Sequence, residues 1–336
     1  MRHAGKGYRF TRSSQFPARP KTRLDRVGDW FVAWGGVCYC VFIVVAVTWF
    51  ARFVACPGVY DDAYCSDLDL LAVFLVAEIM GNLGCFLYFR HENRVEHWQR
   101  HSVVASLCRS MIGDEEQGGS GGSEEAEEEE DEERERNRGK YCVECNRYAP
   151  IRSHHCPLCH ECVLRKDHHC YITGACVGLG NQRYFITFLF WATIGCAVGA
   201  RYIVTYADKE IAHWYPFGWV HYIAPVTVCR WIFGYAPIWS VVTCIIFSFA
   251  CASCMGAFAF FVTQLFYTLH GYTMFEYHSL SIREAYEGDG RGIGDRMRLV
   301  FGPYWAINFL FPAFWFKQKL TPEIADNLFR VRSKLL

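Results

Sequence analysis

Lys, Arg, Asp and Glu make up only 20% of this 336-residue chain, and long blocks of it carry almost no charge. Apolar residues reach 52% and aromatic residues 17%. The length would allow two ordinary soluble domains, but such long charge-poor blocks argue against them. The scarcity of charge therefore predicts a membrane protein.

The formal net charge is zero, but acidic and basic residues are distributed unevenly along the chain. Residues 113–139 hold 13 of the 34 acidic side chains and three arginines, so the remainder has 31 basic and 21 acidic residues. This basic remainder suits anionic lipid surfaces, and we expect membrane lipids, not nucleic acid, as its partners. Residues 113–139 have almost nothing apolar to bury, which predicts a disordered acidic insert. A solvated linker is the simpler interpretation of it, and a partner-binding tract is the alternative.

We expect no cleavable signal peptide, because the first apolar block begins near Trp30, is too long and has no small-residue cleavage site. We expect this block to act as a signal anchor. Four stretches reach the roughly 20 apolar residues that cross a bilayer, namely 30–54, 68–89, 184–206 and 236–269. A fifth run, 301–316, is interrupted by Pro303 and Pro312, which predicts an interfacial segment instead of a span.

The loop 55–69 lacks Lys and Arg and has four aspartates, whereas eight basic residues precede the first span. The positive-inside rule then places the N-terminus in the cytosol and, with four spans, the C-terminus as well. The region between the second and third spans is on the same reducing side, where thiolates persist. Cys56 and Cys65 fall on the opposite side, where a disulfide and two unpaired thiols are equally open alternatives.

Eighteen cysteines would indicate a disulfide scaffold only in a small secreted domain, and here seven of them lie within 142–176 beside five histidines. Paired Cys-x-x-Cys turns present two thiolates to one metal, so this segment predicts two zinc sites. Two sites need eight ligands. Either all seven cysteines and one histidine bind, or six cysteines and two histidines bind while one cysteine stays free.

The order of these residues resembles the cysteine-rich domain of the DHHC protein S-acyltransferases, or palmitoyltransferases. The matching positions are Cys142, Cys145, His155, Cys156, Cys159, Cys162, Asp167, His168, His169, Cys170, Cys176, Val177, Gly178 and Asn181. The resemblance extends over two spans before this segment and two after it. It predicts an α-helical polytopic membrane protein with four transmembrane helices and a cytosolic two-zinc cysteine-rich domain between spans 2 and 3.

Six regions follow from this prediction. They are a cytosolic basic N-terminus (1–29), transmembrane helices 1 and 2 (30–90), a cytosolic linker with the acidic insert (91–140), the cysteine-rich zinc domain (141–183), transmembrane helices 3 and 4 with a luminal loop (184–269), and a cytosolic tail with an interfacial aromatic segment (270–336). The Golgi or endoplasmic reticulum membrane is the expected location, with both termini in the cytosol.

The resemblance also assigns roles within the cluster. It implies one zinc on Cys142, Cys145, His155 and Cys162, and another on Cys156, Cys159, His169 and Cys176. Cys170 is then the free nucleophile, His168 its base and Asp167 the group that orients His168. His154 and His160 are expected as supporting or surface residues. The expected cofactors are two structural zinc ions, with acyl-CoA as the co-substrate.

The implied reaction moves a long-chain acyl group, such as palmitoyl, from acyl-CoA through acyl-Cys170 to thiols of substrate proteins. These partners would carry cysteines near the cytosolic face of the membrane. The alternative is a zinc-stabilised membrane adaptor that has the same fold and transfers nothing. A transporter is disfavoured, because only Glu78 and Asn82 offer polar groups at depth, where a structural role is expected for them.

Two sets of residues are candidates for holding acyl-CoA. The CoA phosphates would be held by basic side chains, namely Arg147, Arg152, Arg165, Lys166 and Arg183. The small residues Ala192, Gly195 and Gly199 lie at near-helical spacing in the third span. They either allow close helix packing or leave room for the acyl chain, and Gly195 is the candidate for the chain contact.

The motifs outside the cluster match the family only in part. The run 273–276 resembles the family's Thr-Thr-x-Glu motif with Met274 at the second Thr, and 300–302 resembles its C-terminal aromatic motif. Tyr171 and Ile172 replace the usual Pro-Trp after the nucleophile, and Arg296 replaces a usual Asn. We expect these changes to alter rate and substrate range and to leave catalysis in place.

Overall fold

The computed structural model describes residues 23–99, 140–150, 152–280, 283, 288–289, 292–313 and 315. The basic leader up to residue 22, the acidic insert at 113–139 and the end of the tail lie outside the described residues. The predictions made for those segments therefore stay predictions.

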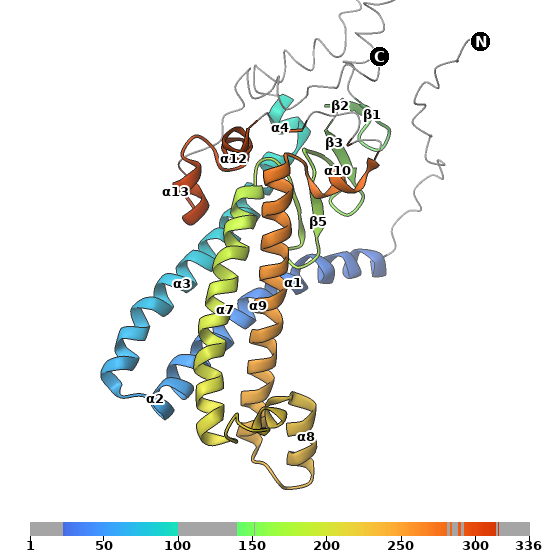
Figure 1. The fold of residues 1–336 in the computed structure, drawn as a ribbon. Helices are drawn as coiled ribbons and strands as arrows, with labels where there is room; N and C mark the ends of the chain where they lie inside the picture. Colours follow the sequence, from blue (N-terminus) through green and yellow to red (C-terminus); the bar gives the residue numbers. More distant parts are fainter. Residues whose placement is uncertain are drawn as a thin grey trace, which may run out of the picture.

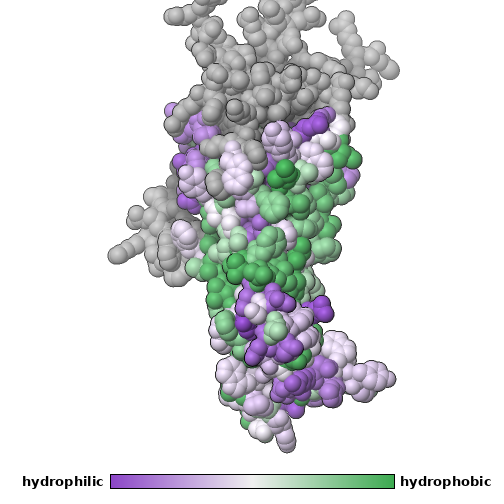
Figure 2. All heavy atoms as spheres, turned by 90° about the vertical axis from the view of Figure 1, so that its left-hand side faces the viewer, coloured by the Kyte–Doolittle hydropathy of each residue, from purple (hydrophilic) through white to green (hydrophobic). Residues whose placement is uncertain are grey.

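Four long helices form the body of the molecule: α1 (Arg23–Phe50), α3 (Asp62–Tyr88), α7 (Gln182–Glu210) and α9 (Ile238–His270) (Figure 1). Within and around them lie four segments long and apolar enough to cross a membrane, of 26 to 33 residues each. Figure 2 shows the matching band of hydrophobic residues across the middle of the molecule. The predicted four-span helical fold is therefore confirmed. Because about 20 residues suffice, the helices tilt or extend beyond the hydrocarbon.

The turn between α1 and α3 is short and is held by a helix cap and a disulfide. It consists of a π-helical turn, η1 (Ala51–Ala55), and the short helix α2 (Cys56–Val59). Asp61 then caps α3 by accepting a hydrogen bond from the backbone N–H of Tyr64 at 2.8 Å. Cys56 and Cys65 form a disulfide across this turn, which settles the two alternatives left open by the sequence.

Small residues let the spans approach closely. A Cβ on Gly195 of α7 would lie 2.8 Å from Cδ1 of Ile79 in α3, and one on Gly199 would overlap the side chain of Val47 in α1. Gly36 of α1 lies directly against the backbone of Ile172. These contacts explain why glycine is needed at the three positions.

Three antiparallel hairpins lie at one end of the bundle, between α3 and α7 in the chain. They follow η2 (Phe89–Asn93) and α4 (Val95–Gln99), and pair β1 (Lys140–Cys142) with β2 (Arg147–Ala149), β3 (Ser153–Cys156) with β4 (Glu161–Leu164), and β5 (His168–Cys170) with β6 (Ala175–Val177). Strands of three or four residues offer little core of their own. The hairpins therefore need other groups to hold them together.

The remaining elements lie at the two ends of the bundle. At the end away from the hairpins, η3 (Gly218–Tyr222) and α8 (Ala224–Ile232) join α7 to α9. At the hairpin end, the tail forms α10 (Met274–His278), α12 (Ile293–Phe301) and α13 (Trp305–Leu310). Phe301 is fully buried beside Ile186 of α7, and Trp191 of α7 donates to the carbonyl of Leu310 at 2.6 Å. The described part of the 301–316 run thus packs beside α7 and forms no span.

Candidate functional site

The first Cys/His cluster joins two hairpins. Cys142 and Cys145 lie in the turn between β1 and β2, while His155 and Cys162 face each other across the β3–β4 pair. Nδ1 of His155 lies 3.2 Å from Sγ of Cys145 and 3.6 Å from Sγ of Cys142. Sγ of Cys162 lies 3.6 Å from Sγ of Cys145. One atom from each of the four side chains converges on a common centre.

The second cluster repeats this arrangement one hairpin later. Cys156 and Cys159 lie at the β3–β4 turn, and His169 faces Cys176 across the β5–β6 pair. Nδ1 of His169 lies 3.3 Å from Sγ of Cys159 and 3.6 Å from Sγ of Cys156. Sγ of Cys159 and Sγ of Cys176 are 3.6 Å apart.

Both clusters fit zinc by the chemistry of their donors. In each, the four donor atoms lie within 4.8 Å of one another, and three thiols and one imidazole form a set typical of structural zinc sites. Each cluster takes two ligands from one hairpin turn and two from the next hairpin. Metal in both clusters would therefore clamp the three hairpins in series.

A fourteen-residue repeat underlies the three hairpins. Cys142, Cys156 and Cys170 stand fourteen residues apart, and each begins the turn of its own hairpin. The residue four places later has a positive φ in all three turns, being Asn146, His160 and Gly174. Aligning the segment 142–176 with itself would reveal this repeat. Treating the cysteines only as metal ligands does not.

The third hairpin has the same turn and gives His169 and Cys176 to the second cluster, but its leading cysteine has no cluster of its own. Thr173 stands where the first two hairpins have their second cysteine, and Arg183 stands where they have the histidine. Cys170 is a free thiol, whereas the equivalent Cys142 and Cys156 belong to the two clusters. The repeat explains structurally why one cysteine of the seven is left over.

Asp167 and His168 form a close pair just before this thiol. Nδ1 of His168 lies 2.6 Å from Oδ2 of Asp167. Burial alone would raise the pKa of the Asp167 carboxyl, but the hydrogen bonds that it accepts, first from His168, hold that pKa below its usual value. Burial lowers the pKa of the His168 imidazole, yet its partners Asp167 and Cys170 outweigh burial and raise this pKa to about 9.

The environment of Cys170 favours its thiolate. The side chain is 7% exposed, and burial alone would raise the pKa of the thiol, but His168 and Thr173 hold that pKa below its ordinary value. Nε2 of His168, on the far side of the ring from Asp167, is buried and makes no hydrogen bond within the described residues. A buried imidazole nitrogen beside a thiol can exchange a proton with it, as an activated nucleophile requires.

The tail motif reaches Asp167 directly. Thr273 caps α10 in a capping box with Glu276, and the backbone N–H of Met274 donates to Oδ1 of Asp167 at 2.7 Å. A backbone group makes this contact, so the replacement of Thr by Met274 leaves it intact. Gln264 of α9 also donates to Asp167, at 2.7 Å, and nothing in the sequence marks this residue as part of the site.

Two of the five basic residues expected at the CoA phosphates are buried in ion pairs. Arg152 is 1% exposed and lies between Glu276 and Asp289. Arg165 is fully buried and pairs with Asp289. Both guanidinium groups face carboxylates and not the surface, which contradicts the expectation of phosphate binding for Arg152 and Arg165.

The other three basic residues differ in exposure. Arg147 is partly exposed and pairs with Glu96 at 2.7 Å, and Lys166 donates to the carbonyl of His155 at 3.1 Å. Arg183 is 5% exposed, lies over the ring of Tyr184 and donates to its hydroxyl. Arg147 and Lys166 thus stay the candidates nearest to solvent.

A polar cavity that the sequence did not predict lies beside the second cluster. It is lined by Arg90 and Arg94, which follow α3, and by Tyr171 of the third hairpin. Arg94 pairs with Glu161 at 2.5 Å. Both arginines precede the cysteine-rich segment, so a search limited to its basic residues could not find them.

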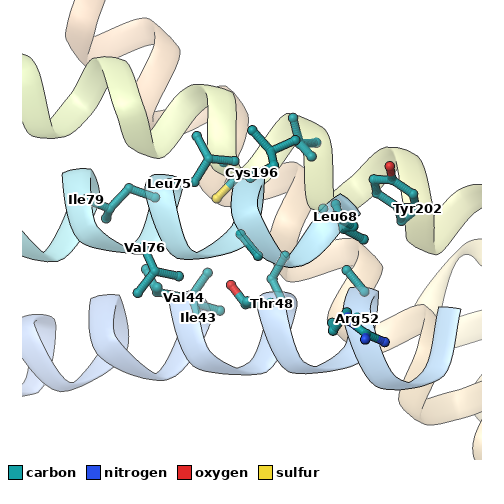
Figure 3. Close-up of a pocket in the computed structure, with 17 residues that line it drawn as sticks. Ile43, Val44, Thr48, Arg52, Leu68, Leu75, Val76, Ile79, Cys196 and Tyr202 are labelled. Atoms are coloured by element: carbon teal, nitrogen blue, oxygen red, sulfur yellow. The ribbon is translucent and has the colours of Figure 1, made fainter. Parts of the chain in front are cut away.

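An apolar cavity lies between α1, α3 and α7 (Figure 3). Its wall includes Val44, Val47, Thr48, Leu75, Val76, Ile79, Gly195, Cys196 and Gly199. Ile79 also belongs to the buried cluster packed around Cys170. Gly195 and Gly199 therefore allow close helix packing and also form part of the cavity wall. The packing role and the acyl-chain role considered for them from the sequence are compatible.

The atypical neighbours of Cys170 are at the surface. Tyr171 is 62% exposed and Ile172 is 44% exposed, and the backbone of Ile172 lies against Gly36 of α1. Away from the thiol, Glu78 and Asn82 are buried in α3, with the Asn82 amide donating to the Glu78 carbonyl at 2.8 Å. This local bond agrees with the structural role expected for that pair.

The two remaining histidines lie outside the metal clusters. His154 packs its ring against Phe275 of α10, with centroids 4.2 Å apart. His160 follows the second cysteine pair and has a φ of 55°. Neither belongs to the two four-residue groups that could hold a metal.

Comparison with known proteins agrees with this geometry. The model of the DHHC palmitoyltransferase family matches residues 135–281, which include all three hairpins, α7, α9 and the capping box. No curated protein matches the chain significantly. Residues 135–281 therefore match the DHHC palmitoyltransferase domain, which is the domain that the cysteine and histidine spacing resembles.

Proposed function

We propose that this protein is a protein S-acyltransferase that moves a long-chain acyl group, palmitoyl above all, from acyl-CoA to cysteine thiols of substrate proteins. The observation that carries the proposal is the third hairpin, where the free thiol of Cys170 follows the close Asp167–His168 pair. Its depressed thiol pKa is the property that a nucleophile needs. The matching family supports the same reaction.

In the first half-reaction, Sγ of Cys170 attacks the thioester carbonyl of acyl-CoA as a thiolate. The bond from the carbonyl carbon to the CoA sulfur breaks, and the CoA thiolate takes a proton from His168 as it leaves. Acyl-Cys170 and neutral His168 remain. Asp167 keeps the ring oriented and stabilises its charged form, so that Nε2 faces the reacting sulfur.

In the second half-reaction, a thiol of the substrate protein attacks acyl-Cys170. His168 takes the proton of this thiol, the new thioester forms on the substrate, and Cys170 leaves as the thiolate. The enzyme returns to its starting thiolate–imidazolium pair. Two thioester exchanges of nearly equal energy are thereby linked through one covalent intermediate.

Zinc has a structural role in this proposal. Two ions, on Cys142, Cys145, His155 and Cys162 and on Cys156, Cys159, His169 and Cys176, would hold the short hairpins in series. This fixes the position of Cys170 on the third hairpin. The groups of the protein that react are the side chains of Cys170 and His168.

The acyl chain is proposed to occupy the apolar cavity between α1, α3 and α7, which shares Ile79 with the surroundings of Cys170. Gly195 and Gly199 form part of its wall. The CoA phosphates would stay at the polar surface near Arg147 and Lys166, with Arg90 and Arg94 as further candidates.

We propose that the hairpin end faces the cytosol in a Golgi or endoplasmic reticulum membrane, with both termini on that side. The disulfide between Cys56 and Cys65 supports this orientation, because it lies at the opposite end of the bundle from the free thiols of both clusters. Disulfides persist in the oxidising lumen and free thiols in the cytosol. Protein substrates would then carry membrane-proximal cysteines on the cytosolic side.

The test is autoacylation of the purified, zinc-loaded protein with labelled palmitoyl-CoA. We expect a hydroxylamine-sensitive label on wild type and none on Cys170→Ser, followed by transfer of the label to a thiol peptide. Cys229→Ser is the matched control, because Cys229 is an exposed thiol on α8 at the other end of the bundle. A folded wild type with both zinc ions and no label would instead indicate a membrane adaptor.

A further inference from the structure

The Asp167 carboxylate begins a continuous line of buried hydrogen bonds across the spans. Its Oδ2 accepts from His168 and, at 2.7 Å, from Nε2 of Gln264 near the end of α9. Oε1 of Gln264 accepts from Nε2 of Gln182, at the start of α7, at 3.3 Å. Oε1 of Gln182 in turn accepts from Arg165. Gln264 and Gln182 are 1% and 0% exposed, so water does not compete for either amide.

Two buried arginines connect these hydrogen bonds to acidic residues of the C-terminal tail. Arg165 pairs with Asp289, whose Oδ1 also accepts from Arg152 at 2.5 Å. Arg152 holds both oxygens of Glu276, at 2.6 Å and 2.5 Å. Buried charges such as these persist only when they are paired and hydrogen-bonded. Each pair therefore fixes the position of the next.

The chain of hydrogen bonds returns to the Asp167 carboxylate, where it began. Glu276 accepts from the backbone N–H of Thr273 at 2.9 Å, and the N–H of the next residue, Met274, donates to Oδ1 of Asp167. Asp167 is thus held at both oxygens, by the tail at Oδ1 and by Gln264 at Oδ2. A carboxylate held from both sides cannot rotate away from His168 without breaking a buried hydrogen bond.

We propose that Gln264, itself held by Gln182 and Arg165, is a positioning residue that aims the Asp167 carboxylate at His168. The inference rests on the proposed acyl transfer through Cys170. It adds that a residue of the fourth span helps to position the catalytic groups. Gln264 acts through Asp167 and His168. Misplacement of a catalytic group by about 1 Å costs on the order of 100-fold in rate, which sets the size of the expected effect.

A purely structural role is the competing explanation, because the Gln264–Gln182 pair also joins α9 to α7. Such a role would lower thermal stability and leave the reactivity of Cys170 unchanged in the molecules that stay folded. The experiment must therefore measure reactivity in folded, zinc-loaded protein.

The test uses three full-length proteins: wild type, Gln264→Leu, which removes the amide, and Gln264→His, which restores an N–H donor. Autoacylation at saturating palmitoyl-CoA should slow by about 100-fold in Gln264→Leu and recover most of its rate in Gln264→His. The palmitoyl-CoA concentration that gives half the maximal rate should not change. Thr263→Val is the control, because Thr263 is an exposed neighbour that bonds to carbonyls of its own helix, and it should keep the wild-type rate.

Alkylation of Cys170 by iodoacetamide, followed by mass spectrometry, measures the same geometry without acyl transfer. It should slow in Gln264→Leu and recover in Gln264→His. Wild-type rates of both alkylation and autoacylation in a folded Gln264→Leu protein with both zinc ions would overturn the positioning role. Rapid alkylation of a wild type that never acylates would refute the proposed function, and the alkylation comparison would still decide the role of Gln264.

A second variant covers the case in which Gln264→Leu does not fold. Gln182→Leu leaves the Gln264 amide in place and removes the group that holds it, together with an acceptor of Arg165. A smaller loss of the autoacylation rate, again with an unchanged half-saturating concentration, is expected there. An unchanged rate in this variant would also contradict the inference.

Discussion

The first two hairpins and the third have the same turn and the same leading cysteine, but that cysteine differs in its chemistry. In the first two, the leading cysteines Cys142 and Cys156 gather three further metal ligands each. After the third leading cysteine, Thr173 and Arg183 of α7 stand at the positions of the second cysteine and the histidine, and Cys170 stays outside both clusters. The third hairpin gives only His169 and Cys176 to a cluster. A reactive thiol can thus be made from a metal-binding hairpin by removing ligands while the hairpin is kept.

The largest effect should come from removing a ligand of the first two hairpins. Cys145→Ser and Cys159→Ser should each lower the zinc content from two to one per chain and unfold the hairpins, because binding energy of a structural zinc is folding energy. Metal analysis and size-exclusion chromatography measure both. Cys170→Ser should keep both ions, and a loss of zinc in that variant would contradict the separation of the third hairpin from the other two.

Restoring a ligand to the third hairpin should remove its activity. Thr173→Cys would place a second thiol where Cys145 and Cys159 stand in the other repeats, so that Cys170 becomes a metal ligand in zinc-containing reducing buffer. Autoacylation should fall by roughly 100-fold, the scale for losing an activated group. Zinc content and autoacylation are measured together. Thr173→Ser is the control, and a fully active Thr173→Cys protein with two zinc ions would refute the comparison.

Opposite pH limits should separate the zinc clusters from the Asp167–His168 pair. Zinc ligands must be deprotonated, so acid should release zinc from both clusters. The pKa of His168 is raised to about 9, so its pairing stabilises the fold fully below the unfolded pKa near 6.5 and is lost as pH rises through 9. The stability difference between wild type and His168→Gln, about 3 kcal/mol at most, should therefore shrink between these pH values. Thermal denaturation at constant zinc measures it, and a difference that grows with pH would contradict the assignment.

The sequence predicted the parts of the molecule that depend on local spacing. Apolar runs of sufficient length predicted the four spans, and the spacing of cysteines and histidines predicted two metal clusters whose members the structure brings together. Those signals act within one helix or between adjacent hairpins. They need no knowledge of how distant segments meet.

What the sequence could not predict depends on contacts between distant segments. Arg152 and Arg165 stand beside zinc ligands and look like surface residues, but their partner Asp289 lies more than 120 residues later. Gln264 was counted within an apolar span, and only the fold brings it to Asp167. Likewise, the disulfide of Cys56 and Cys65 depended on the geometry of a turn, which the spacing did not fix.

The closed line of bonds around Asp167 has a consequence for synthesis of the protein. The hairpins end at Val177, but Asp167 acquires its partners Gln264, Met274 and, through the arginines, Asp289 only when those later segments leave the ribosome. The hairpins could therefore bind zinc early, whereas the Asp167–His168–Cys170 group would be aligned only after the last span has entered the bilayer. The proposed acyl transfer would then begin only after membrane insertion is complete.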